Sequence, residues 1–263
     1  MMNYEAIIFE VKEQAAFITL NRPEAFNGLN LTAGKELMHA AIRCDESPEI
    51  RAVVLTGAGK AFSAGGDLKF FAGYGDQLAV VLKEMTVYCH AAASRLIRMD
   101  KPLITAVNGA AAGMGMSFAI SGDIILAAES ASFTAAYTAA GLSPDGAMTY
   151  ILPRMIGLSR AREMMMTNRR LKAQEALEWG LVNKVVPDGD LLKEAELLAQ
   201  SFANGPTRSF GMVKKLLNES FTTTLETQME QEARGIAGMA RTIDGIEGVN
   251  AFVGKRRPIF KGC

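Results

Sequence analysis

The sequence contains little histidine, cysteine or tryptophan and no excess of either charge. Two histidines and one tryptophan occur in 263 residues, and 28 acidic side chains balance 28 basic ones. A zero net charge argues against the positive field of a nucleic-acid-binding domain. The cysteines, Cys44, Cys89 and Cys263, are odd in number and far apart, which argues against a disulfide framework and a zinc site. We therefore expect a protein of a reducing compartment with no bound metal.

The chain also lacks a long apolar run and a recognisable targeting segment. No stretch approaches the roughly 20 apolar residues that cross a bilayer. Residues 1–5 carry an acid where a secretory signal would have a basic start and an apolar core. The composition is that of a globular protein, with 49% hydrophobic and 21% charged residues, and the length allows a large core. The expectation is a cytoplasmic protein without membrane contact.

Short apolar runs alternate with helical patterns over the first two thirds of the chain. The runs with the length and punctuation of buried strands are 15–20, 52–55, 103–107 and 124–127. Helical spacing of apolar residues lies between them, most clearly over 31–44 and 78–99. This alternation predicts an α/β fold in which helices cover the sheet faces.

The last third of the chain has mostly helical patterns. They cover 161–166, 173–179, 191–203, 206–217, 225–239 and 243–252. One short apolar run at 182–186 is compatible with a further strand. We expect two parts, an α/β core over 1–190 and a helical C-terminal region over 191–263.

Two glycine-rich segments, 57–66 and 109–115, share a form that suggests backbone contact with a ligand. Each follows a predicted buried strand, and small residues let backbone N–H groups approach a ligand closely. The alternative is that both are tight strand exits in which glycine serves a positive φ. Neither fits the phosphate-binding GxxxxGKS/T pattern or a clean GxGxxG after a strand, which argues against nucleotide binding.

Motifs in order along nearly the whole chain resemble the crotonase (enoyl-CoA hydratase/isomerase) superfamily. They are NRP at 21–23, AFSAGGDLK at 61–69, AVNG at 106–109, AGLSPDG at 140–146, LPRMIG at 152–157, AQEALEWGLV at 173–182 and AFVGKR at 251–256. The resemblance implies a core of repeated ββα turns and a helical C-terminal trimerisation region. It further implies a homotrimer or hexamer that acts on an acyl-CoA thioester, with no cofactor besides the coenzyme A of the substrate.

The resemblance also implies which groups meet the substrate. In that family two backbone N–H groups form an oxyanion hole, and by position these belong here to Gly66 and Met114, the second at a site where glycine is more usual. Contacts with the substrate or its CoA carry over to Phe26, Ala64, Lys69, Tyr137, Phe252 and Lys255, the last two towards a neighbouring subunit's CoA. Without the family, the lysines are solvated basic residues and the phenylalanines core or lid aromatics.

Asp145 is the one acid in a place that matches a catalytic acid of the family. Hydratases of that family use two glutamates, and their positions correspond here to Ser117 and Tyr137, neither of which is a useful base near neutral pH. Isomerases of the family carry an aspartate where Asp145 stands. A purely structural interpretation is that Ser143 caps a helix, Pro144 opens it and Asp145 favours its dipole.

These residues lead to the hypothesis of an enoyl-CoA isomerase that shifts a double bond through a thioester enolate. One alternative is a hydratase or a dehalogenase-like hydrolase in which Asp145 works with His90, although a lone histidine on a helix is more often a packing or surface residue. The dehalogenases carry a tryptophan where Tyr137 stands. A further alternative is a non-catalytic binding protein of the same fold. We expect no nucleic-acid partner, and we expect Asp67 to hold its loop rather than to act in catalysis.

Overall fold

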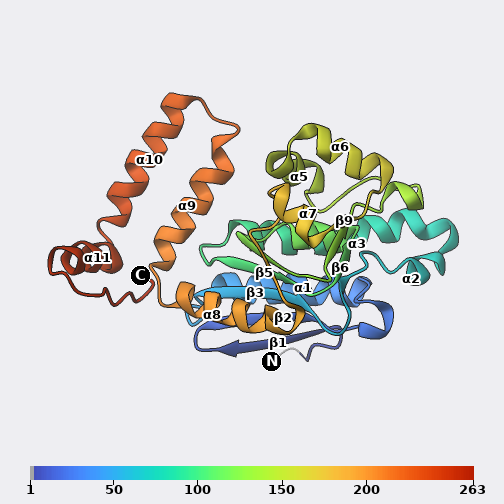
Figure 1. Ribbon diagram of the computed structural model, residues 1–263, viewed down its shortest axis with the longest axis horizontal. Coiled ribbons are helices and arrows are strands. Elements are labelled where there is room, and N and C mark those ends of the chain that lie inside the picture. Colours follow the sequence, from blue (N-terminus) through green and yellow to red (C-terminus); the bar gives the residue numbers. More distant parts are fainter. Residues whose placement is uncertain (1–2) are drawn as a thin grey trace.

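A six-stranded sheet lies at the centre of the protein, in a computed structural model that describes residues 3–263 (Figure 1). Its order is β1-β2-β3-β5-β7-β10. β1 is antiparallel to β2, and all other neighbours are parallel. The bounds are β1 Ile7–Lys12, β2 Ala15–Leu20, β3 Ala52–Gly57, β5 Leu103–Val107, β7 Ile124–Ala128 and β10 Lys184–Val186. All four strands predicted in the first two thirds are confirmed.

A smaller sheet with the order β4-β6-β8-β9 accompanies the large one. Its strands are β4 Ala61–Ser63, β6 Ala110–Ala112, β8 Ser132–Thr134 and β9 Leu171–Lys172. Successive turns of chain place one strand in the large sheet and the next in the small sheet, and a helix then follows, as in β3-β4-α2 and β5-β6-α4. The α/β class and the repeated ββα core are therefore confirmed. The two glycine-rich segments belong to equivalent turns of this repeat, and the first contains β4.

Helices cover the sheets and bury the central strands. They are α1 Leu31–Glu46, α2 Leu68–Ala72, α3 Leu78–Arg98, α4 Met114–Ala119, α5 Met148–Ile156, α6 Leu158–Thr167, α7 Ala173–Glu178 and α8 Leu191–Ala203. α1 packs along α3, while α8 packs against β3, β5 and β7. Every residue of β5 is buried, as an apolar strand in a parallel sheet with both faces covered should be.

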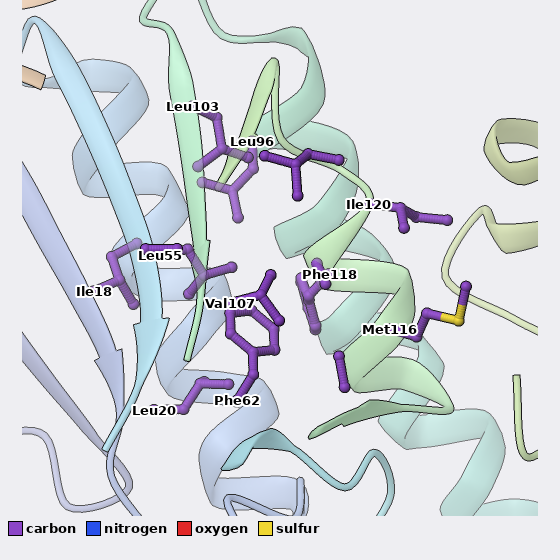
Figure 2. Packing of buried hydrophobic residues seen from close by; sticks show 14 of the residues in the cluster. Ile18, Leu20, Leu55, Phe62, Leu96, Leu103, Val107, Met116, Phe118 and Ile120 are labelled. Atoms are coloured by element: carbon purple, nitrogen blue, oxygen red, sulfur yellow. The ribbon is translucent and has the colours of Figure 1, made fainter. Parts of the chain in front are cut away.

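The core lies between the large sheet, α3 and α4. Phe62 and Phe118 are among the largest fully buried side chains. Figure 2 shows Phe62 and Val107 in the space between the strands and α4, which carries Phe118. This packing fixes the place where β4 and β6 end, and the glycine-rich loops after them meet there.

Three further helices form an arm at one end of the molecule, opposite α2 (Figure 1). This C-terminal arm consists of α9 Thr207–Ser220, α10 Leu225–Met239 and α11 Ile243–Val253. The buried Arg51 guanidinium holds its base by donating to Thr207 Oγ1 at 3.2 Å and to the carbonyl of Phe260 at 3.2 Å. No helix among residues 3–263 has both the length and the apolar character needed to cross a membrane.

The purely structural interpretation of Ser143, Pro144 and Asp145 is wrong. A helix starting at Ser143 and Pro144 is absent, because the next helix, α5, begins only at Met148. Gly146 and Ala147 have φ values of +61° and +65°, which interrupt helical geometry after Asp145. The Asp145 carboxylate is therefore carried by a loop. The predicted division of the chain into a core over 1–190 and a helical region over 191–263 stays a prediction. The first helix after that boundary, α8, packs on the large sheet.

Candidate active site

A cavity of about 310 Å³ opens beside the ends of β4 and β6; we call it the Asp145 cavity. Apolar side chains from α2, α3 and the loops form most of its wall: Leu29, Leu68, Phe71, Leu82, Met85, Met114 and Leu142. Asp145 is the only carboxylate among its lining residues. An apolar pocket with a few convergent polar groups is the usual form of a small-molecule site.

Gly66 lines this cavity, and a short backbone bridge leaves its amide without a partner. Leu29 donates to the carbonyl of Gly65 at 2.7 Å, and Asp67 donates to the carbonyl of Leu29 at 2.9 Å. In such a parallel bridge, the N–H of the middle residue, Gly66, points away from the partner strand. Within residues 3–263, no acceptor is recorded for the Gly66 amide.

Met114 presents a second amide to the same cavity. It is the first residue of α4, so its N–H has no partner within the helix, and no acceptor is recorded for it within the described residues. The Met114 side chain is buried and forms part of the cavity wall. The Met114 side chain therefore adds apolar surface to the pocket and leaves the backbone donor in place.

Gly65 allows the two loops to approach one another. Its φ is +88°, and a Cβ atom there would lie 2.6 Å from the carbonyl oxygen of Ala112 and 3.2 Å from the nitrogen of Met114. Only glycine fits such a close backbone approach. The contact brings the amides of Gly66 and Met114 to one side of the cavity.

Two hydroxyl groups hold Asp145, that of Tyr137 at the carboxylate and that of Ser117 at the backbone carbonyl. Tyr137 donates its hydroxyl hydrogen to Asp145 Oδ1 at 2.6 Å, and Ser117 Oγ lies 3.1 Å from the Tyr137 oxygen and 2.9 Å from the Asp145 carbonyl oxygen. Burial raises the pKa of the Tyr137 phenol, and the negative charge of Asp145 raises it further. Tyr137 therefore remains protonated and acts as a donor.

His90 on α3 lies on the other side of the same carboxylate. Its Nε2 is 3.5 Å from Asp145 Oδ2 and accepts a hydrogen bond from the Gly146 amide at 3.1 Å. A neutral imidazole that accepts at Nε2 carries its proton on Nδ1. Asp145 is thus flanked by Tyr137 at Oδ1 and by His90 at Oδ2.

Cys89 is a cavity residue that the sequence did not reveal. It is buried, lines the Asp145 cavity, and lies on one face of α3 with Leu82 and Met85. Burial raises the pKa of its thiol, and the Asp145 charge adds to that shift. Cys89 is therefore a neutral thiol and serves as apolar wall. The helical spacing over 78–99 predicted a buried face but could not indicate which cavity that face would line.

The predicted substrate contacts divide into two groups. Ala64 and Tyr137 line the cavity, and Phe26 lies beside it, 62% exposed, with its carbonyl accepting from the Ala64 amide at 2.9 Å. Lys69 is exposed on α2 and is not among the lining residues. Phe252 and Lys255 lie at the C-terminal arm, away from this chain's cavity (Figure 1).

Asp67 has two structural contacts. Its carboxylate accepts from the Phe70 amide at 3.1 Å, which caps α2, and forms a 3.0 Å ion pair with Arg22. No group of three or more potential metal ligands occurs among residues 3–263.

Comparison with known proteins identifies the family. The family profile described as enoyl-CoA hydratase/isomerase matches residues 10–263. The chain belongs to the enoyl-CoA hydratase/isomerase family. It is therefore an acyl-CoA enzyme of the crotonase fold.

Family members with different names resemble this chain over most of its length. The 1,2-epoxyphenylacetyl-CoA isomerase of Escherichia coli strain K12 is 38% identical over 264 residues, covering 98% of this chain and 99% of that protein. The 4-chlorobenzoyl coenzyme A dehalogenase-2 of an Arthrobacter species is 33% identical, covering 88% and 84%. The crystal structure of an enoyl-CoA hydratase from Polaromonas sp. JS666 superimposes with a TM-score of 0.92 at 34% identity, covering 97% and 100%. The comparisons therefore define the family and leave the reaction open within it.

Proposed function

We propose that this family member is an enoyl-CoA isomerase that shifts a double bond through a thioester enolate. The observation that carries the proposal is a single carboxylate, Asp145, in an apolar cavity that also receives the amides of Gly66 and Met114. The Gly66 and Met114 amides donate to the thioester oxygen of the substrate. Donors of this kind stabilise the enolate oxygen and are typically worth about 3–4 kcal/mol each.

Asp145 moves the proton. Its carboxylate removes a hydrogen ion from an acyl carbon, and the electron pair of the broken C–H bond passes through the chain to the thioester oxygen, forming the enolate. The resulting carboxylic acid returns a proton to the carbon two positions away, and the double bond settles at its new place. One carboxylate serves both transfers because the delocalised enolate exposes both carbons on one side.

The polar groups around Asp145 favour isomerisation over the two-glutamate addition of water. At the corresponding positions Ser117 and Tyr137 supply hydroxyls, and the raised pKa of Tyr137 makes it a donor rather than a base. Hydrolysis with His90 is the second candidate, favoured by the 3.5 Å contact between His90 Nε2 and Asp145 Oδ2. Against it, the Nε2 lone pair accepts from the Gly146 amide, so a water molecule would first have to displace that donor before His90 could activate it.

The substitution Asp145→Asn tests the proposed function because it keeps the shape of the side chain and removes the base. We expect kcat/KM for a 3-enoyl thioester to fall by about 100-fold or more, the usual contribution of a positioned acid–base group, while CoA-thioester binding persists. Asp76→Asn, on an exposed segment before α3, is the matched control and should retain activity. Full isomerase activity in Asp145→Asn, or a wild-type enzyme that hydrates 2-enoyl or hydrolyses halobenzoyl thioesters faster than it isomerises, would contradict the proposal.

A further inference from the structure

A second cavity of about 340 Å³ lies behind the Asp145 site, with His90 and Gly146 in its wall. We call it the His90 cavity. Polar side chains line it as well, among them Ser94, Arg98 and Asn218. The His90 side chain is 48% exposed, although its Nε2 reaches the catalytic carboxylate. His90 is therefore the side chain through which Asp145 is in contact with this second space.

The two oxygens of the Asp145 carboxylate have different surroundings. Oδ1 is held by Tyr137, which in turn contacts the buried Ser117. Oδ2 faces His90 Nε2. An acyl chain in the Asp145 cavity covers the carboxylate from its own side. When substrate is bound, a proton can therefore pass between Asp145 and water only from Oδ2 through the His90 side chain.

The contact between Asp145 Oδ2 and His90 Nε2 suits a protonated Asp145 better than an ionised one. In the resting enzyme the Gly146 amide donates to Nε2, so an ionised Oδ2 and an Nε2 lone pair face each other without a proton between them. Once Asp145 has taken a proton from the substrate, an O–H on Oδ2 can donate to Nε2. The geometry thus suits the state in which Asp145 holds the transferred proton.

We infer that His90 exchanges this proton with water in the His90 cavity. The carboxylic acid gives its proton to Nε2, which restores the carboxylate and forms an imidazolium, and the Gly146 hydrogen bond is released. The imidazolium exchanges its N–H hydrogens with water. Rotation of the half-exposed ring turns an exchanged nitrogen towards Oδ2, which takes up a solvent proton and passes it to the enolate. The proton removed and the proton returned balance, so the overall reaction is unchanged.

This inference rests on the proposed isomerisation, and an isotope experiment separates the two. Isomerisation of a 3-enoyl thioester in D₂O is followed at early times by mass spectrometry of the 2-enoyl product. The measured quantity is the fraction of product that carries one solvent deuterium, which is a ratio per molecule converted and does not depend on the rate. We expect incorporation into most of the wild-type product.

Two variants examine the role of His90 separately. His90→Gln can still accept from the Gly146 amide but cannot relay a proton. Loss of a proton-transfer group slows the transfer by about 100-fold or more, so deuterium incorporation should fall from most of the product to a small fraction of it. Ser94→Phe, one turn further along α3 in the wall of the His90 cavity, leaves the imidazole in place and excludes water, so incorporation should fall there too. His39→Gln, at the chain's other histidine, exposed on α1, is the control and should match the wild type.

Each result decides between the two ideas. Isomerisation with no solvent deuterium in the wild type, or with equal incorporation in wild type and His90→Gln, overturns the role of His90 and leaves the isomerase assignment standing. Absence of isomerisation in the wild type overturns the proposed function and this inference with it. A fall of deuterium incorporation in both His90→Gln and Ser94→Phe, with His39→Gln unchanged, supports the relay.

Discussion

At the scale of single residues, Gly65 sets the distance between the two backbone donors of the proposed mechanism, those of Gly66 and Met114. In Gly65→Ala the new methyl group would meet the carbonyl oxygen of Ala112 at 2.6 Å, so the loops must separate. We expect kcat/KM to fall by about 100-fold, the effect of losing one oxyanion donor, while the fold persists. Steady-state kinetics with a thermal unfolding curve checks both.

Gly75→Ala is the matched control for that substitution. Gly75 also has a positive φ, +48°, but a Cβ atom there has no neighbour within 4 Å. It therefore carries the backbone strain of an alanine at positive φ, of the order of 1 kcal/mol, without the collision. Equal activity losses in the two variants would mean that strain, not the position of the amides, explains the effect.

The residues of the site were predictable to different degrees. Asp145 could be proposed because it stands where the resemblance places the aspartate of the family's isomerases. His90 was named beside it only in an alternative hypothesis. The hydrogen bond from Ser117 was not predicted, because Ser117 lies 28 positions away along the chain and meets Asp145 only after the ββα turns are packed. Cys89 was missed for a related reason, since its chemistry depends on which cavity its helix face lines.

At the scale of elements, the long periodic segments were predicted and the short ones were not. Helices such as α3 and α8 bury one face, and this imposes a visible 3.6-residue period. The small sheet gives no such signal, because β6 consists of three alanines, 110–112, and β9 has two residues. α5 is obscured by the internal Pro153 and by the loop before it. The repeated ββα core was predicted only from the resemblance to the family.

An ion pair between a buried lysine and a partly exposed aspartate joins the C-terminal arm to the core. Lys214 on α9 contacts Asp123 at 2.7 Å and donates to the carbonyls of Leu96 and Lys101. Burial lowers the pKa of Lys214 and raises that of Asp123, and the attraction between them opposes both shifts. Lys214→Met leaves a carboxylate without its cation, so we expect a loss of about 3–5 kcal/mol in the free energy of unfolding. Denaturant titration at neutral pH measures it.

The pH dependence of the free energy of unfolding of Lys214→Met tests whether the unpaired charge of Asp123 causes the loss. Without Lys214 the pKa of Asp123 rises further above its usual value of 3.8. A carboxyl whose folded pKa is raised contributes stability in acid and loses it as the pH rises through that pKa. The deficit of Lys214→Met should therefore shrink as the pH falls from neutral to mildly acidic. Lys215→Met, at the exposed neighbour, should show neither effect, and a deficit independent of pH would point to packing alone.

At the scale of the whole molecule, the C-terminal arm exposes large apolar side chains of the kind that are usually covered by another subunit. Ile236 on α10 and Phe252 on α11 are 75% and 87% exposed, and such patches usually mark association sites. We expect a homotrimer or hexamer, seen by sedimentation as three or six times the chain mass of 28.2 kDa. In such an assembly Phe252 and Lys255 could contact the CoA in the Asp145 cavity of a neighbouring subunit. The Asp145 cavity of their own chain lies at the other end of the molecule.

A charge in that patch should break the assembly, because a carboxylate buried at an apolar interface loses its hydration. We expect Ile236→Asp and Phe252→Asp to shift the sedimenting species to smaller masses and to raise KM for acyl-CoA as Lys255 leaves the neighbouring subunit. Val80→Asp, at an exposed apolar residue of α3, controls for added charge. A wild-type protein that sediments as one chain, or variants that dissociate with no change in KM, would mean that each cavity binds its CoA without a neighbour.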